Sequence, residues 1–318
     1  MPKVVFFTSL APATAALLTQ HAPADFQVAI YPLDLPAAEQ IALLHDADFL
    51  ILFPGHITED VLRAALHLKL IQLVSVGFDR MDLALCRTLG IPVANNGGAN
   101  ALDVAEHTLA LILGFYRRMV EMDRNVRATR WYAIDSGATT YTIDGKRVGI
   151  VGLGKIGQRV ARLLRAFGAE VIYYDAYPVA TSLEAELGVR RVTLEELLRQ
   201  ADIVTLHMPL NAETRGFIGD AELALMKPNA LLINTCRGPV VNETALFNAL
   251  QTRRILGAAL DVLEQEPPTP DNPLLQLDNV LFTPHTAGVT YDTWPRRGEF
   301  IFANLQRVWA GLPPLATV

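Results

Sequence analysis

The sequence predicts an α/β fold with two doubly wound sheets. Short apolar runs alternate with helix-like stretches along the whole chain, and the runs are continuous rather than interrupted at every second residue. Continuous apolar runs are typical of parallel strands buried on both faces, and alternation of strands with helices is typical of doubly wound sheets. The chain has 318 residues. At roughly 100–200 residues per domain, this length predicts two domains.

The expected strands form two series, and each series predicts its own sheet. The first series comprises residues 4–8, 26–31, 49–53, 70–74 and 91–94. The second comprises residues 147–151, 170–174, 202–206, 230–234, 255–260 and 280–283. A helix is expected after 193, because Thr193 and Glu196 have the spacing of a capping box.

A long amphipathic helix is expected between the two series, beginning after Asn100. Its apolar residues recur at helical spacing, at Leu102, Ala105, Leu109, Ile112, Leu113, Tyr116 and Met119. Such a helix is suited to cross from one domain to the other. The final segment, residues 291–312, is amphipathic as well and could pack on either domain.

Composition and charge argue against several classes of protein. The net charge is −6, whereas a nucleic-acid-binding protein needs a clustered basic face. Five arginines between 117 and 130 are interpreted as a solvated or interdomain helix face. No apolar stretch approaches the roughly 20 residues that cross a bilayer. The apolar start of the chain is broken by Thr8, Ser9 and Pro12, so we expect a buried strand there rather than a signal peptide.

The cysteine content predicts a reducing environment. Only Cys86 and Cys236 occur, far apart and without the spacing of a metal site. A disulfide framework is therefore not expected, which favours a cytoplasmic location, and we expect no metal site.

A glycine-rich loop follows the first strand of the second series. Gly152, Gly154 and Gly157 form a G-x-G-x-x-G motif between that strand and an expected helix at 156–167. The first glycine makes a tight turn, the second lets a pyrophosphate approach the backbone, and the third lets helix and strand pack closely. Amides at the helix N-terminus bind the anion. This context predicts a Rossmann domain that binds a dinucleotide.

An aspartate at the end of the next strand predicts which dinucleotide is bound. Asp175 lies about where the acid that binds the adenosine ribose is expected. A carboxylate there accepts hydrogen bonds from the ribose hydroxyls and repels a 2′-phosphate, so NAD is favoured over NADP.

Three polar segments follow later strands of the second series, at residues 234–238, 261–267 and 283–288. Because the carboxyl ends of parallel strands meet at one edge of a sheet, we expect the three segments to lie at that edge. They offer a guanidinium, a carboxylate and an imidazole. Arginine can bind a carboxylate through two parallel hydrogen bonds, and histidine can take a hydroxyl proton as hydride leaves. This combination is suited to the oxidation of a hydroxy acid.

At these segments the sequence resembles the D-isomer-specific 2-hydroxyacid dehydrogenases. The resemblance spans nearly the whole chain and includes residues 76–82, the glycine loop, residues 207–210 and all three polar segments. It implies that Arg237 binds the substrate carboxylate and keto oxygen, that His285 is the acid/base, and that Glu266 is the partner of His285. Glu266 fits because it directly precedes Pro267, and Glu264 is the lesser candidate.

The resemblance also implies the binding residues. The backbone amides at Val76 and Gly77 would hold the substrate carboxylate together with Arg237. The positions expected to bind NAD are Gly152, Gly154, Lys155, Ile156, Gly157, Asp175, His207, Pro209, Thr235, Cys236, Asp261 and Gly288. Among these, Asp261 would face the nicotinamide amide. For His207 a purely structural role is an equal alternative, and His107 is interpreted as a structural residue.

The domain arrangement implied by the resemblance is discontinuous. Residues 1–99 plus 288–318 would form a flavodoxin-like substrate domain, and residues 100–287 the NAD-binding Rossmann domain. The family also implies a homodimer, with the long helix after Asn100 in the interface.

The substrate expected from the resemblance is a small 2-keto or 2-hydroxy acid, such as glyoxylate, hydroxypyruvate or pyruvate. The runner-up is a D-3-phosphoglycerate dehydrogenase. Members with that activity carry a basic residue near 52–56, where this chain has only His56. An alternative of another class is an NAD-sensing corepressor-like binding protein, against which the complete set of Arg237, Glu266 and His285 argues.

Overall fold

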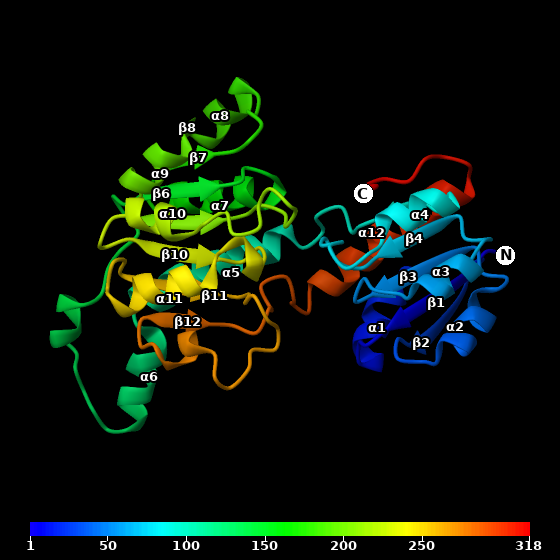
Figure 1. Ribbon diagram of the computed structural model, residues 1–318, viewed down its shortest axis with the longest axis horizontal. Helices are drawn as coiled ribbons and strands as arrows, with labels where there is room; N and C mark the ends of the chain where they lie inside the picture. Colours follow the sequence, from blue (N-terminus) through cyan, green and yellow to red (C-terminus); the bar gives the residue numbers. More distant parts are fainter. The chain divides into compact units, whose positions relative to one another are not determined.

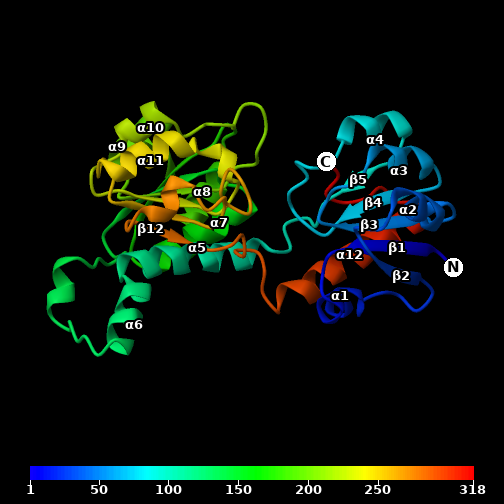
Figure 2. The ribbon, with the colours of Figure 1, turned by 60° about the horizontal axis from the view of Figure 1, so that its bottom comes forward.

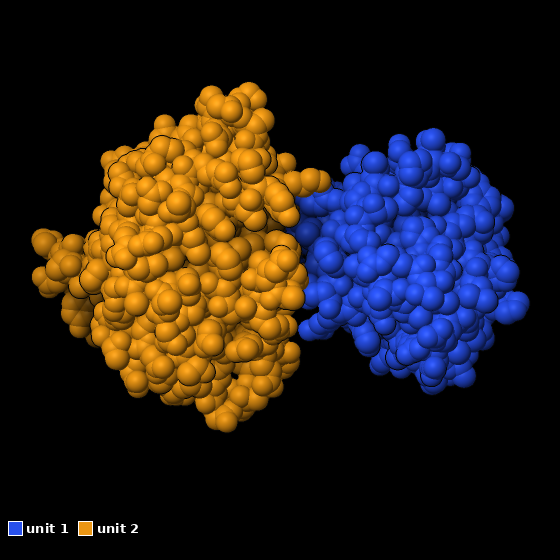
Figure 3. Space-filling view, turned by 45° about the horizontal axis from the view of Figure 1, so that its top comes forward, with its two compact units in different colours: residues 1–100, 289–318 blue, residues 101–288 orange.

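The computed structural model describes all residues, 1–318, and divides into two compact units (Figure 3). Unit 1 comprises Met1–Asn100 and Val289–Val318, and unit 2 comprises Ala101–Gly288. Each unit contains one parallel sheet with helices on both faces, which confirms the predicted fold class. None of the helices is both long and apolar enough to pass through a bilayer.

The sheet of unit 1 has the order β2-β1-β3-β4-β5 (Figure 1). Its strands are β1 (Lys3–Thr8), β2 (Gln27–Pro32), β3 (Phe49–Phe53), β4 (Leu70–Leu73) and β5 (Val93–Ala94). One face packs against α2 (Ala37–Leu44), α3 (Glu59–Ala64) and α4 (Leu83–Leu89). The opposite face packs against α1 (Pro12–Thr19) and α12 (Thr293–Trp309) (Figure 2). This strand order is that of flavodoxin-like folds.

The sheet of unit 2 has the order β12-β11-β10-β9-β6-β7-β8. Its strands are β6 (Arg147–Val151), β7 (Glu170–Tyr174), β8 (Val189–Arg191), β9 (Ile203–Leu206), β10 (Leu231–Asn234), β11 (Gly257–Leu260) and β12 (Val280–Phe282). The order contains the Rossmann arrangement, with the direction of winding reversed between β6 and β9. The carboxyl edge at this switch point is where such folds bind their ligands.

Helices cover both faces of the second sheet. One face packs against α5 (Ala101–Tyr116), α7 (Lys155–Ala166) and α8 (Thr181–Leu187). The other packs against α9 (Leu194–Gln200), α10 (Asp220–Leu225) and α11 (Glu243–Gln251) (Figure 2). The capping box expected before α9 is present, since Oγ1 of Thr193 accepts from the N–H of Glu196 at 3.2 Å and the Glu196 carboxylate accepts from the N–H of Thr193.

The structure differs from the sequence-based prediction at the long helix. Apolar spacing predicted one helix through Met119, but α5 ends at Tyr116 and α6 (Met119–Arg127) begins separately. Arg118 adopts a left-handed backbone conformation, with φ 49°, which breaks the helix between them. Met119 is therefore exposed instead of continuing the buried stripe. A 3₁₀ turn, η1 (Asp135–Ala138), follows α6.

The structure settles the place of the C-terminal segment and contains one strand that was not predicted. The C-terminal amphipathic segment forms α12, which packs on unit 1 through Ile301, Phe302 and Leu305. Strand β8 was not predicted, because it has only three residues and two of them are exposed arginines.

Candidate active site

The glycine loop joins β6 to α7, and its three glycines meet different surroundings. A Cβ at Gly152, where φ is +95°, would lie 2.5 Å from the carbonyl oxygen of His207. A Cβ at Gly157 would lie 2.2 Å from the carbonyl oxygen of Gly152. A Cβ at Gly154 would meet nothing within 4 Å. The first and third glycines thus allow close backbone packing, while the space beside Gly154 can admit a ligand at the N-terminus of α7.

Asp175 lies directly after β7, beside the glycine loop. Its Oδ2 accepts a hydrogen bond from the N–H of Leu153 at 2.7 Å, and its Oδ1 accepts from the N–H of Tyr177 at 3.0 Å. The guanidinium of Arg191 donates to the Asp175 carbonyl at 2.9 Å. Two backbone donors therefore orient the carboxylate at the same strand edge as the loop. This geometry suits a dinucleotide whose pyrophosphate lies at the loop and whose ribose lies beyond it.

His207 lies after β9, with its carbonyl oxygen close to Gly152 of the glycine turn. Its Nε2 lies 2.9 Å from Oγ1 of Thr205, and its buried Nδ1 has no hydrogen-bond partner. Burial lowers the pKa of His207 to about 3, so the ring is neutral at physiological pH. With its Nδ1 buried and its Nε2 beside Thr205, His207 is suited to a structural or cofactor-contacting role.

The other expected cofactor positions lie around the same strand ends. Lys155 is exposed and Ile156 partly buried at the start of α7, and Pro209 is exposed after β9. Thr235 is buried, with its hydroxyl 3.2 Å from that of Thr108 on α5. Gly288 is the last residue of unit 2.

The three polar segments follow β10, β11 and β12, which are adjacent in the sheet. Arg237 lies three residues after β10, Asp261 directly follows β11, and His285 lies three residues after β12. Parallel pairing brings all three to one carboxyl edge. This proximity was expected from the sequence on the strand pattern alone.

Glu266 and His285 form a close pair. Nδ1 of His285 lies 2.7 Å from Oε2 of Glu266, whose Oε1 accepts from the N–H of Leu263 at 3.1 Å. The pKa of Glu266 is below its ordinary value. Burial alone would raise it. The hydrogen bond and charge of His285 have the opposite effect, as do the Leu263 N–H and the charge of Arg237, and together they outweigh burial. An ionised Glu266 holds the proton on Nδ1 and leaves Nε2 to exchange a proton with a bound molecule.

The backbone of His285 is held by Asp261. His285 has a left-handed conformation with φ 55°, and its N–H donates to the carbonyl of Asp261 at 2.8 Å. The buried Asp261 carboxylate accepts from the N–H groups of Thr286 and Ala287, each at 2.9 Å. It also accepts from the hydroxyl of Thr283 at 2.6 Å. Asp261 therefore fixes the chain before and after His285, in a conformation that non-glycine residues rarely adopt.

His107 on α5 completes this network. Its Nε2 lies 3.0 Å from Oγ1 of Thr283. Because the Thr283 hydroxyl donates to Asp261, it accepts from His107, whose Nε2 must carry a proton. No role was predicted for Thr283, although a threonine between a buried strand and a histidine is a signal that could have drawn attention to it.

Arg237 lies in a turn that is held by Asn234. The Asn234 side chain donates to the carbonyl of Arg237 at 2.9 Å and accepts from the N–H of Cys236 at 3.0 Å. The guanidinium donates to the Cys236 carbonyl at 2.7 Å. Burial raises the pKa of the Cys236 thiol, so it stays protonated and is a poor nucleophile. The guanidinium is thus the group of this segment that can bind an anion.

In unit 1, Val76 and Gly77 lie in the loop after β4. Their carbonyls accept from the Asn95 side chain at 2.9 Å and from the Ser75 hydroxyl at 2.7 Å. The Asn96 side chain donates to Val74 at 2.9 Å. No hydrogen bond is formed by the N–H of Val76 or Gly77, which suits an anion-binding loop. Asn95 and Asn96 were not anticipated, although paired asparagines after a strand are a polar cluster of the kind that marks a site.

The chain is similar to known proteins over most of its length. A sequence profile described as "D-isomer specific 2-hydroxyacid dehydrogenase, NAD binding domain" matches residues 109–287. The chain is 38% identical over 295 residues to a glyoxylate reductase of Korarchaeum cryptofilum, covering 91% of this chain and 89% of that one. It is 37% identical over 254 residues to a D-3-phosphoglycerate dehydrogenase of Archaeoglobus fulgidus, covering 80% of this chain but only 48% of that longer one.

A solved structure extends the likeness to both units. It is the NAD-complexed form of a D-isomer specific 2-hydroxyacid dehydrogenase from Lactobacillus delbrueckii ssp. bulgaricus, with a TM-score of 0.83 and 27% identity. The match covers 99% of each chain.

Proposed function

The chain belongs to the D-isomer-specific 2-hydroxyacid dehydrogenases, and we propose how its residues carry out the reaction. It is an NAD-dependent oxidoreductase acting on the CH–OH group of a 2-hydroxy acid. We assign residues 100–287 to the NAD-binding domain and residues 1–99 plus 288–318 to the substrate domain. When bound, the nicotinamide cofactor accepts or supplies the hydride.

His285 is proposed as the acid/base. The pairing of its Nδ1 with Glu266 at 2.7 Å is the observation that carries this assignment. In oxidation, Nε2 takes the proton of the C2 hydroxyl. In reduction, protonated His285 gives that proton to the keto oxygen. The ionised Glu266 keeps the ring in this tautomer and stabilises its protonated form.

Arg237 is proposed to bind the substrate carboxylate and to stabilise charge on the reacting oxygen. A guanidinium can form two parallel hydrogen bonds to a carboxylate, and a well-placed donor at a developing oxyanion contributes about 3–4 kcal/mol. The N–H groups of Val76 and Gly77 would provide the second contact to the carboxylate. A hydroxy acid is thereby held by its carboxylate while C2 is left to react.

The cofactor is proposed to be NAD in preference to NADP. The oriented carboxylate of Asp175 supports this, because it can accept from ribose hydroxyls and repels a 2′-phosphate. Gly154 would admit the pyrophosphate, and the remaining expected positions, from Lys155 to Gly288, would line the rest of the cofactor.

The substrate is proposed to be a small 2-keto acid such as glyoxylate or hydroxypyruvate. The glyoxylate reductase of Korarchaeum cryptofilum is similar over nearly its full length, which supports this class. The runner-up is phosphohydroxypyruvate, because a D-3-phosphoglycerate dehydrogenase is also similar. His56 is the only basic residue in 52–56, which disfavours a phosphate there.

We further propose that the protein is a homodimer. Large apolar side chains are exposed on α6 and in the segment after it, namely Met119, Val120, Val126, Trp131 and Ile134, the last two 78% and 90% exposed. Apolar surface of this kind is typical of a protein interface. Sedimentation of the purified protein would show one species of twice the chain mass, whereas a monomer at micromolar concentration would contradict the proposal.

A cytoplasmic location is proposed from the cysteines. Cys86 and Cys236 are both free, and neither is paired in a disulfide. Free thiols are typical of proteins from reducing compartments.

The first experiment is to follow NADH absorbance with a panel of keto acids. The panel contains glyoxylate, hydroxypyruvate, pyruvate, 2-ketoisocaproate and phosphohydroxypyruvate, with NADPH in parallel. Turnover of a small keto acid with NADH is expected. A preference for phosphohydroxypyruvate would favour the runner-up, and failure of the whole panel despite NADH binding would overturn the proposed substrate class.

A further inference from the structure

Glu266 lies in a loop that has little packing of its own. The loop runs from β11 to the 3₁₀ turn η3 (Pro273–Gln276), and residues 264–271 are all exposed. Exposed loops with few buried contacts belong to the least stable parts of a protein. Nevertheless, Glu266 must keep its carboxylate within hydrogen-bond distance of His285, so other contacts must fix the loop.

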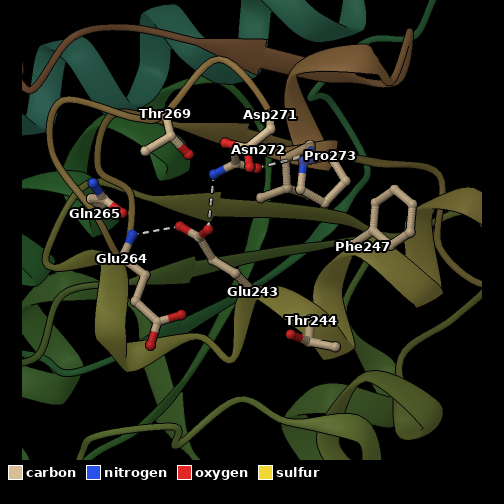
Figure 4. Close-up of a pocket in the computed structure, with 10 residues that line it drawn as sticks. Glu243, Thr244, Phe247, Glu264, Gln265, Thr269, Asp271, Asn272 and Pro273 are labelled. Atoms are coloured by element: carbon tan, nitrogen blue, oxygen red, sulfur yellow. Dashed lines mark hydrogen bonds between the residues drawn. The ribbon is translucent and has the colours of Figure 1, made fainter.

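The carboxylate of Glu243 binds this loop near both of its ends. One oxygen, Oε1, accepts a hydrogen bond from the N–H of Glu264. The other, Oε2, accepts from the side-chain amide of Asn272 at 3.2 Å. Figure 4 shows the Glu243 carboxylate between these two donors. One side chain thus joins two points of the chain that flank Glu266.

Glu243 itself is well anchored. It is the first residue of α11, whose N-cap Asn242 accepts from the N–H of Ala245 at 2.9 Å. Helix α11 packs into the core of unit 2 through Leu246 and Leu250. The position of the carboxylate is therefore set by the rigid part of the unit.

Apolar packing holds the two ends of the loop but not its middle. Leu263 and Leu274 pack against the core that contains α11. Between them a cavity of about 370 Å³ lies beside α11, bordered by Glu243, Thr269 and Asp271 (Figure 4). At this cavity the two hydrogen bonds of Glu243 connect the helix to the loop.

The opposite side of the loop touches the turn that carries Arg237. A Cβ at Gly238 would lie 1.9 Å from the carbonyl oxygen of Leu263, so the two backbones are in direct contact. The N–H of Leu263 in turn donates to Glu266 Oε1 at 3.1 Å. This N–H belongs to the peptide just before Leu263–Glu264, so a shift of the Leu263–Glu264 peptide would displace the adjoining donor that orients Glu266.

We propose that Glu243 is a positioning residue for the reaction, acting through the Glu266 loop. It fixes the Leu263–Glu264 peptide against Gly238 and so holds the Glu266 carboxylate toward His285. This inference rests on the proposed role of Glu266. Glu243 contacts neither Glu266 nor His285 in the hydrogen bonds of the site, so its effect on turnover is indirect.

The test compares Glu243→Ala and Glu243→Gln with the unaltered enzyme. Alanine removes both acceptors, and we expect kcat for keto-acid reduction to fall about tenfold, with NADH affinity within about twofold. Glutamine keeps one acceptor oxygen but cannot accept from both donors, so an intermediate loss is expected. Asp271→Asn is the control, because it removes a carboxylate from the same cavity, and its kcat should be unchanged. If Glu243→Ala does not fold, the kcat of Glu243→Gln tests the proposal.

A double variant tests the route of the effect. If Glu243 acts through Glu266, adding Glu243→Ala to Glu266→Gln should lower kcat by less than about twofold more. A full further tenfold loss would overturn that route. Unchanged kcat in both Glu243 variants, with Glu266→Gln impaired, would overturn this inference alone. Full activity of Glu266→Gln would overturn the role of Glu266 and this inference with it.

Discussion

Oε2 of Glu266 lies 2.7 Å from Nδ1 of His285, although the two residues are 19 positions apart in the sequence. The second oxygen of Glu266 is occupied by the Leu263 N–H, so both carboxylate oxygens have fixed donors. The histidine side chain is 48% exposed. A bound molecule can therefore reach the imidazole ring, and the Glu266 carboxylate at Nδ1 fixes the orientation of the ring.

Glu266→Gln should lower kcat for reduction about 100-fold, because the amide does not stabilise protonated His285. Steady-state kinetics of keto-acid reduction would check this. An unchanged kcat would contradict the assigned pairing. NADH affinity, measured by fluorescence, should be unaffected.

The same pair predicts an acid limit to stability. Since the folded protein lowers the pKa of Glu266, its ionised form stabilises the fold above the ordinary carboxyl pKa of 4.5. This contribution is lost as pH falls through the lower pKa of the folded state. Urea unfolding at a series of pH values should show a smaller loss below about pH 4.5 in Glu266→Gln than in the unaltered protein. Parallel curves for both proteins would speak against the pairing in solution.

Arg237→Lys should be nearly as damaging as Arg237→Ala. Lysine retains the charge but lacks the planar fork that binds a carboxylate through two hydrogen bonds. We expect kcat/KM for the keto acid to fall by about 10²- to 10³-fold in both variants, with NADH binding retained. Steady-state kinetics with NADH fluorescence titration would check this. A lysine variant with full activity would show that charge alone is required.

Thr283→Val should destabilise unit 2 and slow the reaction. The hydroxyl of Thr283 donates to Asp261 and accepts from His107, and valine leaves both without this partner. Removing a donor from the buried Asp261 carboxylate costs about 1–3 kcal/mol in the free energy of unfolding. Urea denaturation gives that value. Thr283→Ser keeps the hydroxyl and is the matched control; equal losses in the two variants would assign the effect to packing.

Gly154→Ala and Gly157→Ala should separate cofactor binding from folding. The added methyl at Gly154 meets no protein atom, so we expect stability within about 0.5 kcal/mol but NADH binding weakened at least about tenfold. At Gly157 the methyl would collide with the Gly152 carbonyl, which should cost about 1–3 kcal/mol of stability. Thermal unfolding and NADH titration measure the two effects. Normal NADH affinity in Gly154→Ala would place the pyrophosphate elsewhere.

The fold class and the order of the segments that carry chemistry could be predicted from the amino-acid sequence. Parallel strands buried on both faces leave continuous apolar runs, which is why the ends of β10, β11 and β12 could be expected at one edge. The sequence could not reveal β8, whose three residues are mostly exposed, nor the break at Arg118. A left-handed residue leaves no mark on apolar spacing, because it depends on local backbone conformation rather than on burial.

The side chains that support the reactive groups became known from the three-dimensional structure. His107 and Thr283 lie 176 positions apart, and Glu243 reaches Glu264 and Asn272 across 21 and 29 positions. These contacts depend on how helices and strand-end loops pack, and no local pattern of residue types encodes such a hydrogen bond. Burial patterns are local and repeat along the chain, so a sequence displays them. The position of a single carboxylate is a result of the whole fold.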